Sequence, residues 1–101
     1  QELIKAGFYR ASGAMCGVVL EKHFTQVCFQ HQITTKKKEP TISEFNDELK
    51  NAKVIDLATW RNIQLLGDLR NKCCHDKKVD PTKDDANDLL NGTKKIIKTV
   101  F

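Results

Sequence analysis

The apolar residues of this chain recur at steps of three and four positions along most of its length, the spacing that places side chains on one side of an α-helix. No stretch of useful length alternates apolar with polar residues, as a half-buried β-strand does, and no internal repeat is visible. A chain of 101 residues suffices for one hydrophobic core but not for two. We therefore predict a single all-α domain over residues 1–101.

The first predicted element is one long amphipathic helix from Glu2 to about His31. Its apolar stripe consists of Ile4, Phe8, Ala11, Met15, Val18, Val19, Val27 and Cys28. Gly7, Gly13 and Gly17 weaken this helix. They are either tolerated glycines or a thin face against which a neighbouring helix, of this subunit or of a second one, packs closely.

Helix-start signals place the other three helices. Thr41 and Glu44 have capping-box spacing, Asp56 can cap the next helix, and either Asp80 or Thr82 begins the last one. The predicted inward residues are Ile42, Phe45 and Leu49, then Trp60, Ile63, Leu66, Leu69 and Cys73, then Ala86, Leu89, Leu90, Thr93, Ile96, Ile97 and Val100. Four amphipathic helices with short connections predict an antiparallel four-helix bundle.

The net charge of +4 and the pI near 8.9 favour acidic partners without identifying one. Lys36, Lys37 and Lys38 lie in the expected loop after the first helix, and Lys77 and Lys78 lie in the connection before the last one. These lysines are candidate nucleic-acid contacts. A lysine run is more often only a solvated surface, and that alternative stays open.

The cysteines and the apolar runs indicate the compartment. Cys16, Cys28 and Cys73 fall at positions suited to a reduced helical core, and no apolar run approaches the roughly 18 residues of a transmembrane helix. We therefore expect a cytoplasmic domain that makes no membrane contact. Because the chain begins at Gln1, without an initiator Met or a signal peptide, we expect a fragment of a longer protein.

The densest group of chemically versatile side chains is the segment Arg70-Asn71-Lys72-Cys73-Cys74-His75. An arginine followed by a polar residue, with a histidine five positions later, resembles the R-x4-H signature of the HEPN superfamily (higher eukaryotes and prokaryotes nucleotide-binding domains). The preceding stretch from Trp60 to Leu69 and the early helix from Gly7 to Lys22 also resemble small bacterial HEPN-like domains. The similarity covers nearly the whole chain and is weak between Gln30 and Val54.

This resemblance implies a HEPN-like bundle that forms a homodimer, in which two R-x4-H motifs face one groove. Such dimers cleave RNA without a metal or other cofactor and leave a 2′,3′-cyclic phosphate. Arg70 and His75 would be catalytic, Asn71 and Lys72 supporting, and Glu21 the acidic residue of the first helix. The resemblance also implies a prokaryotic toxin–antitoxin or phage-defence system, with an antitoxin or the other domains of a parent protein as partners.

The residue types suit this chemistry. A neutral imidazole can take a proton from a ribose 2′-OH or deliver one to the leaving oxygen. A guanidinium can hold two phosphate oxygens and stabilise the charge that develops in the transition state. On a regular helix Arg70 and His75 lie about 140° apart, so a shared site requires a helix end or a second subunit.

Other interpretations remain open. An Arg and a His at a helix end also serve as a cap or a surface ion pair, so the alternative is a non-catalytic helical interaction module of a larger protein. Cys73, Cys74 and His75 are adjacent, but adjacent ligands converge poorly on one zinc ion, so we predict no metal. His23 and His31 have no partner at a recognisable spacing and are expected at the surface.

Overall fold

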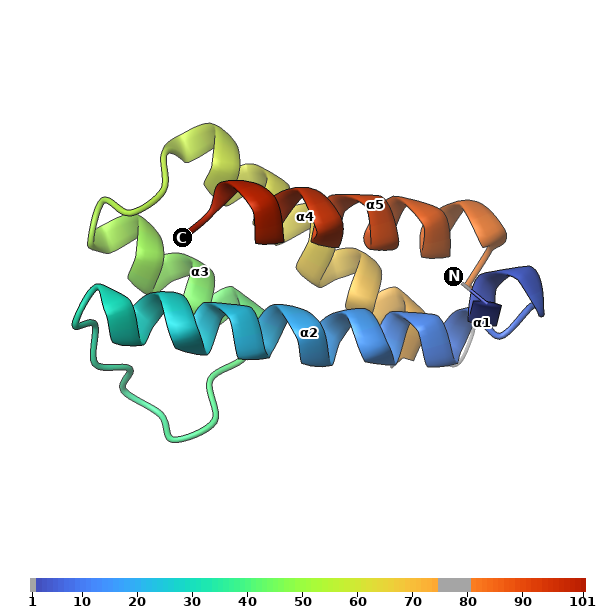
Figure 1. Cartoon of the computed structure of the whole chain (residues 1–101), viewed down its shortest axis with the longest axis horizontal. Coiled ribbons are helices and arrows are strands. Elements are labelled where there is room, and N and C mark those ends of the chain that lie inside the picture. Colours follow the sequence, from blue (N-terminus) through green and yellow to red (C-terminus); the bar gives the residue numbers. More distant parts are fainter. Residues whose placement is uncertain (1, 75–80) are drawn as a thin grey trace.

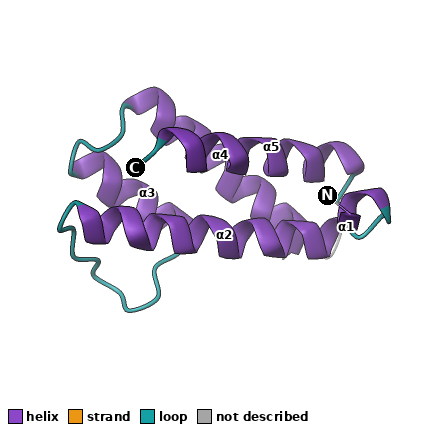
Figure 2. Cartoon of the chain, viewed as in Figure 1, coloured by secondary structure: helices purple, strands orange, loops and turns teal. Residues whose placement is uncertain are grey.

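The regular elements of the chain are helices throughout the computed structural model, which describes residues 2–74 and 81–101 (Figure 1, Figure 2). They are α1 (Glu2–Lys5), α2 (Tyr9–Gln30), α3 (Ile42–Asn51), α4 (Leu57–Cys74) and α5 (Lys83–Thr99). The predicted all-α class is confirmed. None of the helices in the described ranges has the length and apolarity needed to cross a lipid bilayer.

The predicted first helix is interrupted after one turn. Gly7 adopts a left-handed φ of 84°, its N–H donates to the Ile4 carbonyl at 3.0 Å, and the Phe8 N–H donates to the Leu3 carbonyl at 2.7 Å. This pair of bonds closes a helix C-terminus, and glycine adopts the left-handed conformation without a steric penalty. The prediction of one continuous helix from Glu2 is therefore wrong at its start, and α2 begins anew at Tyr9.

The directions of the long helices follow from the residues that meet across their contacts. The pairs that meet α4 are Gly13–Cys73 and Gly17–Arg70 from α2, Ile42–Gly67 and Asn46–Trp60 from α3, and Asp85–Lys72 and Gly92–Leu66 from α5. In the pairs from each of these three helices, the residue numbers increase along that helix while they decrease along α4. Helices α2, α3 and α5 therefore share one direction, and α4 runs against them (Figure 1). The antiparallel order predicted for the first two long helices is wrong, because residues 31–41 lead the chain back alongside α2 before α3 begins.

The starts predicted for the last three helices, at Thr41, Asp56 and Thr82, are confirmed. Thr41 with Glu44, and Thr82 with Asp85, form complete capping boxes, and the Asp56 carboxylate accepts a backbone N–H from three positions further on at 2.8 Å. The carboxylates of Glu44, Asp56 and Asp85 each accept a hydrogen bond from a threonine backbone N–H at the start of their helix. This bond is the main reason why the pKa of each carboxyl lies below its ordinary value.

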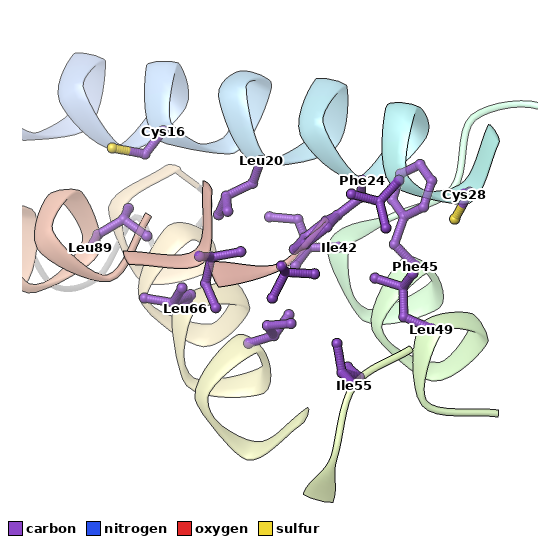
Figure 3. Packing of buried hydrophobic residues seen from close by; sticks show 14 of the residues in the cluster. Cys16, Leu20, Phe24, Cys28, Ile42, Phe45, Leu49, Ile55, Leu66 and Leu89 are labelled. Atoms are coloured by element: carbon purple, nitrogen blue, oxygen red, sulfur yellow. The ribbon is translucent and has the colours of Figure 1, made fainter. Parts of the chain in front are cut away.

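The core lies where α2, α3, α4 and α5 meet. Leu20 and Phe24 of α2 point into the core, where Phe45 and Leu49 of α3 also lie, as Figure 3 shows. The Phe24 and Phe45 ring centroids are 5.9 Å apart. The inward residues predicted for the last three helices are buried or half-buried, as expected. The largest side chains with almost no exposed surface are Phe24, Leu20, Leu49, Ile63, Leu89 and Val27.

The face of α2 that packs into the core agrees with the predicted one only at Val27 and Cys28. Of the stripe proposed from the sequence, Met15 is 60% exposed and Val18 53% exposed. The buried side instead carries Ser12, Gly13, Cys16, Gly17, Leu20, Phe24, Val27 and Cys28. Because α2 has apolar residues on both sides, the three- and four-residue period does not identify the inner one.

Candidate functional site

A cleft of about 280 Å³ lies between α2, α4 and the start of α3. Three of the residues predicted to form a site, Glu21, Arg70 and Asn71, line it together. The other lining residues come from the first turn of α3 and from the middle of α4, and they are Thr41, Ile42, Ser43, Gln64, Gly67 and Asp68. The cleft therefore joins residues that are far apart in the sequence.

Arg70 reaches the cleft across the backbone of α2. A Cβ atom added to Gly17 would lie 2.7 Å from the Arg70 Nε and 3.1 Å from its Cγ. The stem of the half-buried arginine thus rests on α2 at the position where a side chain is missing. Of the two uses proposed for the glycine face, close packing of a neighbouring helix within the same subunit is confirmed for Gly13 and Gly17.

Glu21 follows Gly17 on α2 by one helical turn, so both residues lie on the same side of the helix. Its side chain is half-buried, whereas Asn71, the residue after Arg70 on α4, is exposed. The cleft consequently has a carboxylate on the α2 wall, opposite an amide and a guanidinium that come from α4.

The first turn of α3 contributes the third wall. The Thr41 hydroxyl accepts the Glu44 N–H at 3.2 Å. The N–H groups of Ile42 and Ser43 belong to the first turn of the helix, where an N–H group has no carbonyl acceptor within the helix. A helix N-terminus carries partial positive charge and attracts anions. Together with the Arg70 guanidinium, it can bind an anion of phosphate size, and the nearby Glu21 carboxylate can accept a proton.

The structure places the other predicted site residues elsewhere. Lys72 pairs with Asp85 of α5 at 3.0 Å and does not line the cleft. Lys36, Lys37 and Lys38 are exposed, and Lys37 pairs with the carboxylate of the α3 capping box at 3.1 Å. His75, Lys77 and Lys78 lie outside the described residues, so the described part of the R-x4-H motif stops before its histidine.

The cysteines with described side chains are core residues. Cys16, Cys28 and Cys73 are buried, and burial, with a smaller contribution from the Glu48 charge, raises the pKa of the Cys28 thiol. Within residues 2–74 and 81–101, no three His, Cys, Asp or Glu side chains are grouped so that they could hold a metal ion.

The sequence interpretation missed two features. The capping box predicted the start of α3 but carried no information that this turn faces Arg70. His23, expected at the surface, is half-buried, and its Nε2–H donates to the Val100 carbonyl at 2.6 Å. His31 is exposed as expected and donates in the same way to the carbonyl of Phe101 at 2.6 Å.

Comparison with known proteins gives one match. The searches of curated proteins and of solved structures return no significant similarity. A protein-family model described as "Domain of unknown function (DUF4145)" matches residues 1–101. Since this match covers the whole 101-residue sequence, the chain belongs to the DUF4145 family.

Proposed function

We propose that this domain binds single-stranded RNA and cleaves it without a metal, in the cleft lined by Glu21, Arg70 and Asn71. The supporting observation is that Glu21, which is distant in sequence, lines the same cleft as the arginine and asparagine of the R-x4-H pattern, beside the first turn of α3. The resemblance to HEPN domains was the reason to name these three residues together. Their proximity in space is an independent argument for one site.

In the proposed reaction, Arg70 and the first turn of α3 hold the non-bridging oxygens of the scissile phosphate. A general base takes the proton of the ribose 2′-OH, and the 2′-oxygen attacks phosphorus. The bond from phosphorus to the 5′-oxygen breaks, and a general acid protonates that oxygen, leaving a 2′,3′-cyclic phosphate. We assign these proton transfers to His75 with Glu21, and we assign Asn71 to positioning the phosphate.

We further propose that the domain is HEPN-like in its arrangement of four long helices and acts as a homodimer. Support comes from the outer face of α2, where Met15, Val18 and Val19 are exposed together with Ala11 and Ala14. Contiguous apolar residues on a surface commonly mark a contact with another protein. The prokaryotic defence setting, the cytoplasmic location and an antitoxin partner belong to the same proposal and rest on the resemblance.

The decisive experiment measures cleavage of end-labelled single-stranded RNA in the presence of EDTA. We expect Arg70→Ala and His75→Ala each to lower the rate by about 10²-fold or more. Arg61→Ala is the matched control, because Arg61 is an exposed arginine of the same helix that does not line the cleft. A wild-type protein that neither binds nor cleaves RNA, or equal losses in all three variants, would contradict the proposal.

A second function is favoured by the same α2 face. In this alternative, the domain is a non-catalytic interaction module, and Met15 and Val18 contact another domain of a larger protein. Light scattering of the wild type and of Val18→Asp separates the two proposals. A dimer that Val18→Asp disrupts, together with RNA cleavage, favours the ribonuclease. A monomer without RNA affinity favours the module.

A further inference from the structure

A wider groove of about 920 Å³ adjoins the cleft along α2. Glu21, Thr41 and Arg70 line both hollows, so the two meet at the arginine. From that junction the groove follows α2 past Lys22 to Gln26, and its opposite wall is the segment that precedes α3 and includes Glu39 and Pro40. The proposed function uses the cleft but assigns no role to this groove.

The α2 wall of the groove has polar and charged side chains of the kinds that suit contact with a nucleotide chain. Lys22 and Gln26 are exposed and one helical turn apart, so they project from the same side of α2. Lysine provides a cation for a phosphate, and glutamine provides a donor and an acceptor for the edge of a base.

The opposite wall determines which part of the ligand faces it. Glu39 is acidic and exposed, so it repels phosphate. The α2 wall carries the Glu21 carboxylate as well, but beside it Lys22 supplies a cation that favours phosphates on this side. The α2 wall from Val18 to Gln26 is about 12 Å long, which allows the chain to continue beyond the phosphate that Arg70 contacts. A single strand, with its bases unpaired, can offer both its backbone and its base edges to such a groove.

We propose that this groove receives the nucleotides next to the scissile phosphate of a single-stranded RNA, with Lys22 contacting a phosphate and Gln26 a base edge. The inference rests on the proposed function and adds to it the path of the substrate. It requires that affinity increase with the length of the strand. It also requires that Lys22 contribute only when the strand is long enough to reach it.

The test uses fluorescein-labelled, 2′-O-methylated oligouridines, which lack the attacking hydroxyl, so binding is measured without cleavage. Fluorescence anisotropy compares a dinucleotide with an octanucleotide at several salt concentrations. We expect the octanucleotide to bind wild type more tightly. Lys22→Ala should weaken octanucleotide binding about two- to fivefold and reduce the salt slope by about 0.7, with no effect on the dinucleotide.

Lys98→Ala is the matched control, because Lys98 is an exposed lysine of α5 that does not line the groove. Equal effects of the two lysine substitutions, or affinity independent of length, would overturn the groove proposal. If Arg70→Ala still abolishes binding in that case, the cleft proposal stands. If wild type binds neither oligonucleotide, the proposed function fails and the groove proposal fails with it.

Discussion

Gly13 lies where α2 packs directly against α4, and Gly13→Ala tests the close approach of these two helices. A Cβ atom at this position would lie 2.4 Å from the Cβ of Cys73 and 3.2 Å from its Sγ. The Cys73 Cβ is one bond from the α4 backbone, and the residue is fully buried. The side chain therefore cannot turn away, and the helices must separate to admit the new methyl group.

Two opposing terms determine the magnitude. In a helix interior, alanine is more stable than glycine by about 1 kcal/mol. Overpacking a tight core costs about 1–3 kcal/mol, and the rigid contact at Cys73 favours the upper end. The free energy of unfolding should therefore fall by about 2 kcal/mol. With a urea m-value of about 1.5 kcal/mol/M, the midpoint falls by roughly 1.3 M.

Urea unfolding followed by far-ultraviolet circular dichroism measures this change, and Gly67→Ala is the control. Gly67 also lies inside a helix, but an added Cβ would be 3.6 Å from the nearest atom of Ile42, an ordinary contact. This variant should therefore gain about 1 kcal/mol. The effect of the glycine-to-alanine substitution on the unfolded state is the same in both variants, so it cancels when their free energies of unfolding are compared. Equal stability of the two variants would refute the close packing of α2 on α4.

Two further predictions concern the site and the helix caps. In Gly17→Ala, the new Cβ would meet the flexible Arg70 side chain at 2.7 Å. We expect the free energy of unfolding to change by less than about 1 kcal/mol and the RNA affinity to fall toward that of Arg70→Ala. Unchanged RNA affinity would contradict the placement of the arginine. The pKa of Asp85 is lowered, first by the Thr82 N–H and then by Lys72, so its stabilising effect is fully present above its unfolded pKa of about 3.9 and is lost as the pH falls through the folded-state pKa. Thermal unfolding between about pH 5 and pH 2 should show a smaller acid-induced loss in Asp85→Asn than in wild type, and identical pH profiles would exclude this role of the cap.

The sequence alone predicted the features that depend on neighbouring positions. The helix starts at Thr41, Asp56 and Thr82 follow from side chains that bond the backbone within three residues. The inner faces of α3, α4 and α5 follow from a single apolar stripe on each helix. Both signals depend only on residues close together in the sequence, so they can be recognised without knowing which helices pack against one another.

The tertiary structure decided what the local pattern leaves ambiguous. On α2, both Leu20 and Met15 belong to helical stripes, and packing into the common core buries the leucine and leaves the methionine exposed. The direction of α3 depends on how residues 31–41 return along α2, a path that no short motif encodes.

The same distinction applies to the site. The sequence, through the R-x4-H resemblance, singled out Arg70 and Asn71, and it named Glu21 by analogy alone. The common cleft exists because Gly17 leaves room for the arginine to cross α2. It also depends on the position of the first turn of α3, beside Arg70. Contacts between distant segments depend on the whole packed core, and for that reason only the folded chain brings these groups together.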